Sequence, residues 1–217
     1  MTRAVVFDLD GTLIDSVPDL HVAVNRMLAD AGKSPLTLAE VMAFVGNGIP
    51  NLVKCAMEAR EIPMGDHGAM IAAMLGHYAR DPVTLTRIYD GVPETLSTLR
   101  GEGYRLGVCT NKSYTPTLQI LTALNLDSLF DVVIGGDSLP VRKPDPAPLH
   151  ASFRALGASG VFVGDSEVDA ETGQRAMVPF ALYTRGYRKT PVEALPHDAV
   201  FDDFAQLPQI LQRLTAA

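Results

Sequence analysis

The 217-residue sequence is poor in the features that mark secreted and membrane proteins. Its two cysteines, Cys55 and Cys109, form neither a metal-ligand pair nor a disulfide framework. No apolar run approaches the roughly 18 residues that cross a bilayer. The N-terminal segment lacks the apolar stretch and small-residue cleavage site of a signal peptide. We therefore expect a cytoplasmic protein with reduced thiols and no membrane association.

Positive charge is also scarce. Eighteen Lys and Arg residues against 25 Asp and Glu residues give a net charge of -7. The sequence has no basic cluster, and an acidic surface repels a phosphate backbone, so we expect no nucleic-acid partner. Apolar residues make up 47% of the chain and charged residues 20%, which indicates a packed core rather than disorder.

Short apolar runs alternate with helical patterns through most of the chain. The runs are mostly continuous rather than alternating, as expected for strands that are covered on both faces. Repeated strand and helix predict an α/β fold with a parallel sheet and right-handed crossovers. The expected strands are residues 4–9, 105–110, 131–135, 160–164, 180–184 and 199–201, and the expected helices are residues 93–101, 115–125, 147–156, 168–176 and 204–214.

One interval, residues 18–81, contains no strand candidate. Within it, Leu20, Val24 and Met27 fall on one face of a helix. Further helices are expected at residues 49–60 and 67–78, and N-terminal capping patterns occur at residues 16–19 and 37–40.

The helical interval predicts an insertion in an otherwise continuous core. We predict that residues 1–15 and 82–217 form the core and that residues 16–81 form an all-helical cap domain. The chain length suits one core with a modest insertion.

The stretch FDLDGT places Asp8 and Asp10 at the end of the first expected strand. Both repulsion and desolvation oppose two carboxylates at the end of a buried strand, so a positive partner is expected nearby. Residues i and i+2 of a strand face the same way, which allows both side chains to reach one site. Gly11 allows a tight turn directly after them.

Other polar segments should converge on the same edge of the sheet, because ligands of open parallel sheets bind beyond the carboxyl ends of the strands. These segments are TNK at residues 110–112, RKPDP at residues 142–146 and VGDSEVD at residues 163–169. Oxygen ligands from Asp8, Asp10 and Asp165 suit Mg²⁺.

Positive charge and hydrogen-bond donors complete the expected site. Lys143 supplies a compact positive charge, and Thr110 supplies a hydroxyl beside backbone N–H groups. Together with the carboxylates, these groups predict a phosphate site with its metal. Taken singly, Thr110 could be a turn residue, Lys143 a surface lysine, Asp165 a helix N-cap and Asp169 a favourable charge at a helix start.

Four segments resemble the motifs of the haloacid-dehalogenase superfamily, in its phosphatase form. FDLDGTLIDS resembles the first motif, Thr110 the second, Lys143 the third, and Gly164 to Ser166 with Asp169 the fourth. The resemblance spans nearly the whole expected core. It implies a Rossmann-like sheet with strand order 5-4-1-2-3 and a helical cap inserted after the first motif.

The resemblance also implies a role for each motif residue. Asp8 would attack phosphorus and form an aspartyl phosphate, and Asp10 would serve as general acid and then general base. Mg²⁺ would be held by Asp8, the main-chain carbonyl of Asp10, and Asp165. Phosphoryl oxygens would contact Thr110 and Lys143, and Asp169 would orient Lys143. The further expected residues are Asn111 at the substrate and Gly11 and Ser166 as supporting residues.

Within the superfamily, the chain most resembles phosphoglycolate phosphatases. The pattern FDLDGTLIDSVPDL, the segment at residues 89–112 and the loop Gly46-Asn47-Gly48 carry this likeness. The partner expected is a small phosphorylated metabolite, namely 2-phosphoglycolate, contacted by that loop. A glycine that ends a helix is the alternative interpretation of the loop. A sugar phosphate, a nucleotide and pyrophosphate stay open as substrates, as do a monomer and a homodimer.

Three other functions stay open. A phosphomutase resembling β-phosphoglucomutase would use the same aspartates, and a phosphonatase would need a cap lysine, for which Lys54 is the candidate. A phospho-accepting module similar to a response-regulator receiver would need no turnover. Asp10 argues against this last function, and it also argues against a dehalogenase, because that branch lacks the second aspartate.

Overall fold

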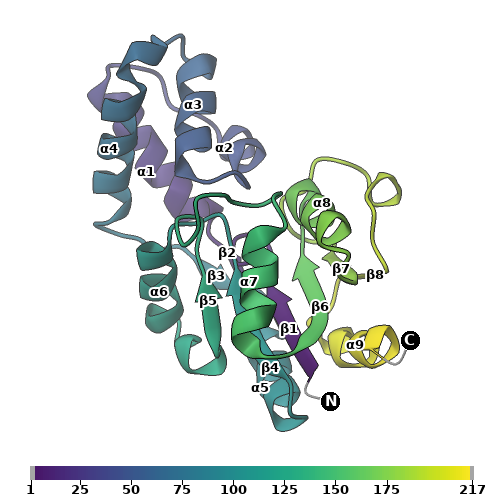
Figure 1. Ribbon diagram of the computed structural model, residues 1–217. Helices are drawn as coiled ribbons and strands as arrows, with labels where there is room; N and C mark the ends of the chain where they lie inside the picture. Colours follow the sequence, from purple (N-terminus) through teal and green to yellow (C-terminus); the bar gives the residue numbers. More distant parts are fainter. Residues whose placement is uncertain (1–2, 216–217) are drawn as a thin grey trace. The chain divides into compact units, whose positions relative to one another are not determined.

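The computed structural model describes residues 3–215, and the chain divides into two compact units. One unit contains Met1–Asp15 and Ile88–Ala217, and the other contains Ser16–Arg87. Figure 1 follows the chain through both units in sequence colours. The chain passes between them at two short strands, β2 (Ile14–Asp15) and β3 (Arg87–Ile88).

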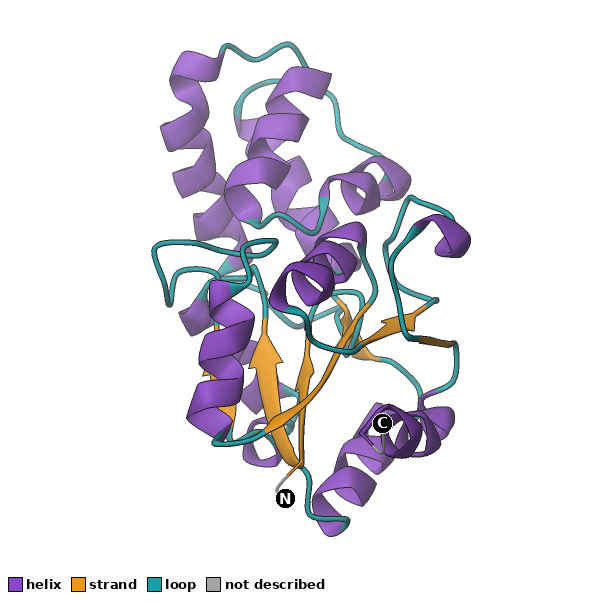
Figure 2. Cartoon of the chain, turned by 45° about the vertical axis from the view of Figure 1, so that its right-hand side comes forward, coloured by secondary structure: helices purple, strands orange, loops and turns teal. Residues whose placement is uncertain are grey.

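A parallel sheet lies at the centre of the first unit, with helices on its two faces (Figure 2). Within residues 3–215 this sheet has six strands, in the order β5-β4-β1-β6-β7-β8. Every neighbouring pair is parallel, which confirms the predicted α/β fold. The strands are β1 (Arg3–Phe7), β4 (Arg105–Cys109), β5 (Val132–Ile134), β6 (Ser159–Gly164), β7 (Phe180–Tyr183) and β8 (Ala199–Phe201).

The strand order differs in detail from the order implied by the resemblance. Read from β7, the series β7-β6-β1-β4-β5 corresponds to 5-4-1-2-3. The sheet then continues to β8, which pairs with β7 through Leu182 and Val200 and adds a strand that the five-strand order lacks. Asp8, Thr110 and Asp165 follow β1, β4 and β6, which are adjacent in the sheet.

Helices cover both faces of the sheet because its strands are apolar on both sides. Val5, Val6 and Phe7 of the central strand are fully buried. Burying such a side chain stabilises a fold by about 1.5–3 kcal/mol before the entropic cost. The helices of this unit are α5 (Val92–Gly101), α6 (Tyr114–Ala123), η2 (Asp127–Leu129), α7 (Ala147–Leu156), α8 (Glu167–Ala176), η3 (Val192–Ala194), η4 (Phe204–Gln206) and α9 (Leu207–Thr215).

The helical unit packs the apolar faces of its helices against one another. Leu20, Val24 and Met27 are buried, as the helical spacing predicts. The pattern at residues 37–40 is a true capping box, in which the Thr37 and Glu40 side chains each accept from the other's backbone N–H group. The helices are α1 (Val17–Asp30), α2 (Leu38–Phe44), α3 (Ile49–Ala59), η1 (Met64–Asp66) and α4 (His67–Tyr78).

Asp19 explains one departure from the expected boundaries of this unit. Its buried carboxylate accepts the N–H groups of Leu85, at 3.0 Å, and Thr86, at 2.7 Å. Residues 82–87, expected in the core, therefore belong to the helical unit. Helix α1 begins where the pattern at residues 16–19 predicts, with Ser16 at the N-cap and Pro18 in the first turn, but the Ser16 side chain makes no cap hydrogen bond.

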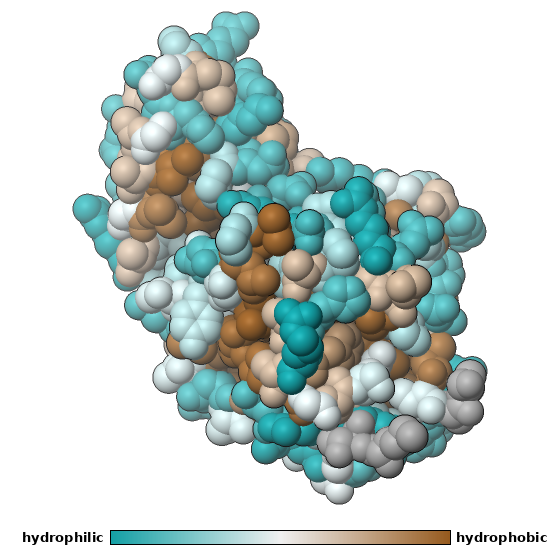
Figure 3. All heavy atoms as spheres, in the orientation of Figure 1, coloured by the Kyte–Doolittle hydropathy of each residue, from teal (hydrophilic) through white to brown (hydrophobic). Residues whose placement is uncertain are grey.

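The surface is mixed in character. On the face that Figure 3 shows, hydrophobic residues form separate patches among hydrophilic ones. Among the helices of residues 3–215, none combines the length and the apolar character that a membrane crossing requires.

Candidate active site

The first candidate motif follows the central strand directly. The N–H of Asp8 donates to the carbonyl of Val163 at 2.9 Å, so Asp8 continues the pairing between β1 and β6. The chain then turns at Gly11, whose φ of +88° is a conformation that favours glycine. Three successive N–H groups, those of residues 12–14, donate to the carbonyl of Leu9 and hold this turn. Asp8 and Asp10 are thereby presented at the carboxyl end of the sheet.

Lys143 is the buried positive partner of Asp8. Its Nζ lies 2.9 Å from Oδ1 of Asp8 and 2.7 Å from Oδ1 of Asp169. Burial alone would lower the pKa of Lys143, but the charges of Asp169 and Asp8 outweigh it and raise the pKa above its ordinary value. Lys143 is thus held as an ammonium group, and the alternative interpretation as a surface lysine was wrong.

Asp8 is held in an unusual electrostatic environment. Burial raises its pKa from 3.8 to about 7, although Lys143 acts in the opposite direction. The negative charges of Asp169 and Asp10 add to the rise. A carboxylate that is desolvated and crowded by like charge is available to a cation or an electron-poor centre.

Asp165 follows β6 and is almost wholly buried. It accepts the hydroxyl of Thr12 at 2.8 Å and the N–H of Tyr187 at 2.6 Å. Burial, followed by the charges of Asp169 and Asp8, raises its pKa well above 3.8. The alternative interpretation of Asp165 as a helix N-cap is wrong, because the N-cap of α8 is Ser166.

Glycines surround Asp165 for steric reasons. A Cβ atom on Gly11 would lie 2.4 Å from Oδ2 of Asp165, and one on Gly186 would lie 2.2 Å from the same oxygen. No side chain tolerates such distances, so both loops approach Asp165 through bare backbone. Gly186 was not recognised in the sequence, because it belongs to a loop after β7 that carries none of the expected motifs.

Asp169 combines two functions. Its Oδ2 accepts from the N–H and the hydroxyl of Ser166, at 3.1 and 2.6 Å, and closes a capping box at the start of α8. Its Oδ1 accepts from Lys143. The favourable position at a helix start and the contact with Lys143, both considered from the sequence, occur together.

The loop after β4 brings three polar residues to the same edge. Thr110 continues the sheet through its N–H, which donates to the carbonyl of Ile134 at 3.0 Å. Asn111 donates from Nδ2 to the carbonyl of Lys143 at 3.0 Å and so joins two of the candidate motifs. Lys112 places its Nζ 3.0 Å from Oδ2 of Asp10.

Lys112 is not among the site residues expected from the sequence. The residue lies in the TNK segment, whose convergence on the site was expected, and it is one of five lysines in the chain. Its side chain is only 5% exposed. A lysine directly after a strand that points to the ligand edge is the signal that could have identified it.

The loop Gly46-Asn47-Gly48 lies in the helical unit, between α2 and α3. Gly46 and Gly48 have φ angles of +116° and +80°, and Gly48 is the N-cap of α3. These backbone angles explain the two glycines locally, while contact with the substrate stays a prediction. Lys54, the candidate imine lysine, lies on α3 with its Nζ 3.8 Å from Glu58 and half of its side chain exposed.

The donor chemistry of the candidate site fits a magnesium ion. Asp8, Asp165 and Asp169 each offer a carboxylate oxygen within 4.8 Å of the others. The candidate site contains four carboxylates and two ammonium groups. When all of them are ionised, the excess negative charge is one that a divalent cation would balance. Within this group, Asp169 accepts from Lys143 and Ser166, Asp165 accepts from Thr12 and Tyr187, and Asp8 lies against Lys143. The charged side chains of the cluster are Asp8, Asp10, Asp165, Asp169, Lys112 and Lys143.

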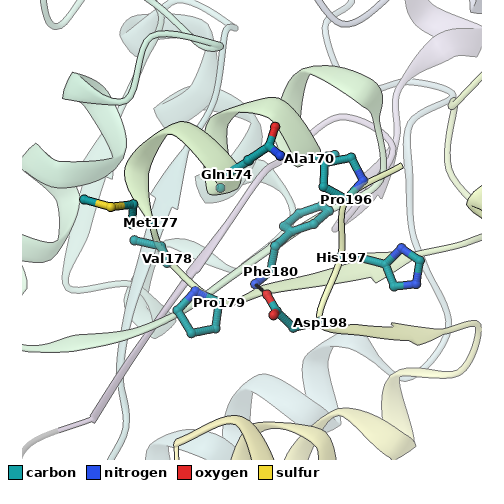
Figure 4. A pocket seen from close by; sticks show the side chains of 10 residues that line it. Ala170, Gln174, Met177, Val178, Pro179, Phe180, Pro196, His197 and Asp198 are labelled. Carbon is teal, nitrogen blue, oxygen red and sulfur yellow. Dashed lines mark hydrogen bonds between the residues drawn. The ribbon is translucent and has the colours of Figure 1, made fainter. Parts of the chain in front are cut away.

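A separate pocket lies beside the start of β7 (Figure 4). The N–H of Phe180 donates to Oδ2 of Asp198 at 2.7 Å within it. Its other lining includes Met177, Val178 and Pro179, which are apolar. None of the predicted site residues is among the described residues that line it, so the candidate active site does not lie in this pocket.

Comparisons with known proteins agree with the motifs. The model of the haloacid dehalogenase-like hydrolase family matches residues 5–183, and the chain belongs to this family. It is 51% identical over 215 residues to a phosphoglycolate phosphatase of Cereibacter sphaeroides (strain ATCC 17029 / ATH 2.4.9), covering 98% of this chain and 99% of that protein.

Two further relatives extend the comparison. A phosphoglycolate phosphatase of Rhodobacter capsulatus is 44% identical over 218 residues, with 99% of each chain covered. The crystal structure of a predicted phosphoglycolate phosphatase from Haemophilus somnus 129PT superposes with a TM-score of 0.90 at 33% identity, covering 96% of this chain and 97% of that one. The resemblance inferred from the four motifs is therefore confirmed at the level of the family.

Proposed function

We propose that the chain is a Mg²⁺-dependent phosphatase that hydrolyses 2-phosphoglycolate to glycolate and phosphate. The observation that carries this proposal is the ion pair between Asp8, which directly follows the central strand, and Lys143. A second carboxylate, Asp10, follows Asp8 two residues later in the chain. Relatives that are named phosphoglycolate phosphatases and match almost the whole chain support the choice of substrate.

The first step is transfer of the phosphoryl group to the protein. A carboxylate oxygen of Asp8 forms a bond to phosphorus, while the bond from phosphorus to the ester oxygen breaks. The leaving oxygen keeps that bond's electron pair and takes a proton from Asp10. The products are the free alcohol and an aspartyl phosphate on Asp8.

The second step restores the protein. The Asp10 carboxylate takes a proton from water, and the water oxygen forms a bond to phosphorus. The bond between phosphorus and Asp8 breaks, its electron pair returns to the Asp8 carboxylate, and inorganic phosphate leaves. Asp10 is then protonated again for the next cycle.

Charge on the phosphoryl oxygens is balanced by the surrounding groups. Lys143 and the Thr110 hydroxyl hold these oxygens, and Asp169 keeps Lys143 in place. Mg²⁺, for which Asp8, Asp165 and the main-chain carbonyl of Asp10 are the proposed ligands, supplies further positive charge there when bound. Asn111 and the loop Gly46-Asn47-Gly48 are the proposed substrate contacts outside the phosphoryl site.

The test is release of inorganic phosphate from 2-phosphoglycolate by the purified chain. Wild type and Asp8→Asn are compared with Mg²⁺ and with a chelator, beside sugar phosphates, nucleotides and pyrophosphate. We expect Mg²⁺-dependent release that prefers 2-phosphoglycolate and is lost in Asp8→Asn, because the amide cannot attack phosphorus.

Each other result points to a different function. Release of phosphate from other esters but not from 2-phosphoglycolate would support the phosphatase mechanism and reject 2-phosphoglycolate as the substrate. Transfer of phosphate between positions of a sugar without its release indicates a phosphomutase. A stable acyl phosphate without turnover indicates a phospho-accepting module.

A further inference from the structure

Each of the two motif aspartates has a lysine of its own. Lys143 contacts Asp8, whereas Lys112 contacts Asp10, with 3.0 Å between Nζ and Oδ2. The two lysines come from different loops, after β4 and before α7. The side chains of Lys112 and Asp10 are 5% and 14% exposed, so their ion pair is largely removed from solvent screening.

The backbone of Lys112 is fixed on both sides. Its N–H donates to Oγ1 of Thr110 at 3.2 Å, and its carbonyl accepts the N–H of Gly136 at 2.8 Å. A Cβ atom on Gly136 would lie 2.3 Å from the carbonyl oxygen of Asn111, so this close packing of the two loops requires glycine. The side chain of Lys112 is therefore attached to a firmly held backbone, which a residue that positions another group requires.

We propose that Lys112 is a positioning residue that holds Asp10 in the orientation needed for proton transfer, an inference that rests on the proposed function. The ammonium group fixes Oδ2 of Asp10, and the other carboxyl oxygen then exchanges the proton with the leaving oxygen and later with water. Charge-assisted contacts are short and directional, so a buried ammonium group selects one carboxyl rotamer. A misplacement of 1 Å in a reacting group can cost about 10²-fold in rate.

This role differs from phosphate binding in what it affects. A lysine that binds the phosphoryl group would matter equally for every phosphate ester. A lysine that positions the proton donor matters most when the leaving alkoxide needs a proton, and little when the leaving group is a stable anion such as p-nitrophenolate. The dependence on the leaving group therefore separates the two roles.

The experiment compares Lys112→Met and Lys112→Arg with wild type on 2-phosphoglycolate and p-nitrophenyl phosphate. Lys189→Met is the control, because Lys189 is an exposed lysine of the same unit. For Lys112→Met we expect kcat/KM on 2-phosphoglycolate to fall about 10²-fold and that on p-nitrophenyl phosphate to change less than about 3-fold. Lys112→Arg, which keeps the charge, should recover part of the loss.

A burst measurement adds a second readout. Activation of water by Asp10 is needed for every substrate, so in Lys112→Met a burst of p-nitrophenolate should precede slow turnover. In an Asp10→Asn background, Lys112→Met should cause no further loss, because its effect passes through Asp10.

Other outcomes overturn the inference and can be told apart from failure of the proposed function. An equal fall of kcat/KM on both substrates, with Lys112→Arg no better than Lys112→Met, would assign Lys112 to phosphate binding or to stability alone. Unchanged kinetics in Lys112→Met would show that Asp10 needs no partner. If wild type hydrolyses neither ester, the proposed function fails, and the inference fails with it.

Discussion

Oδ1 of Asp169 lies 2.7 Å from Nζ of Lys143, while the other oxygen of the same carboxylate caps helix α8. One side chain thus connects the start of a helix to the ammonium group beside Asp8. Both Asp169 and Lys143 are almost wholly buried, so neither charge is balanced by solvent. The position of the ammonium group consequently depends on a contact that also stabilises the helix.

Replacement of Asp169 should separate these two effects. Asp169→Asn keeps an oxygen for the cap but removes the negative charge from Lys143, so we expect kcat for phosphate release to fall about 10²-fold. The free energy of unfolding should fall by about 2 kcal/mol. Steady-state kinetics and urea unfolding measure the two quantities.

Ser166→Ala is the matched control for this change. It removes the capping hydroxyl at the same helix start and leaves the contact between Lys143 and Asp169 intact. We expect a stability loss of about 1 kcal/mol with kcat within about threefold of wild type. Equal kinetic losses in the two variants would show that Asp169 acts only through the helix.

Substitution of Gly186 should weaken metal binding specifically. In Gly186→Ala the new Cβ atom would meet Oδ2 of Asp165 at 2.2 Å, which forces the carboxylate or the loop to move. We expect the Mg²⁺ concentration for half-maximal activity to rise at least about tenfold, in keeping with losses seen when metal-site geometry is disturbed. Titration of activity with Mg²⁺, supported by calorimetry of Mg²⁺ binding, measures the change.

Gly101→Ala provides the comparison for Gly186→Ala. Gly101 ends α5 in the same unit, and a Cβ atom there meets nothing within 4 Å. Its Mg²⁺ dependence should match that of wild type. A similar dependence in Gly186→Ala would mean that Asp165 does not hold the metal.

The two cysteines should differ in reactivity. Burial raises the pKa of the Cys109 thiol to about 12, whereas Cys55 is partly exposed on α3. The thiolate is the reactive form, so the folded protein should react quickly at Cys55 and slowly at Cys109. Titration of the native protein with a thiol reagent should show one thiol that reacts quickly, and this fast reaction should be absent in Cys55→Ser. The second thiol, Cys109, should react only after unfolding. Two fast equivalents in the native protein would contradict the burial of Cys109.

Much of the core could be predicted from the sequence because its strands are continuous apolar runs. Those runs end at Asp8, Thr110 and Asp165, and the parallel topology brings strand ends together without further information. The pairing of Lys112 with Asp10 could not be predicted, because it depends on how two loops pack through Gly136. The same holds for Asp19, whose carboxylate binds backbone groups more than 60 residues away along the chain.

The stability of the metal-free protein should fall as the pH rises, and Asp8 should be one cause. Its pKa of about 7 in the folded protein exceeds 3.8, so the folded state binds the proton more tightly than the unfolded state does. The stabilisation from this proton is complete below pH 3.8 and is lost as the pH rises to about 7. A shift of this size corresponds to a few kcal/mol, at about 1.4 kcal/mol per pKa unit.

Thermal unfolding in the presence of a chelator, from pH 5 to pH 8, measures this effect against Asp8→Asn. The variant carries a neutral group of similar size, so its melting temperature should decrease less over this range than that of wild type. Titrating groups away from the cluster contribute equally to both proteins and cancel in the comparison, whereas Asp165, whose pKa the Asp8 charge helps to raise, contributes to the difference. At pH 8, Mg²⁺ should restore much of the loss in wild type and less in Asp8→Asn, because a bound cation balances the carboxylate that the proton has left. Parallel pH profiles for the two proteins would show that the Asp8 carboxylate is already ionised at no cost in the folded state, and the proposed crowding of charge around it would then be wrong.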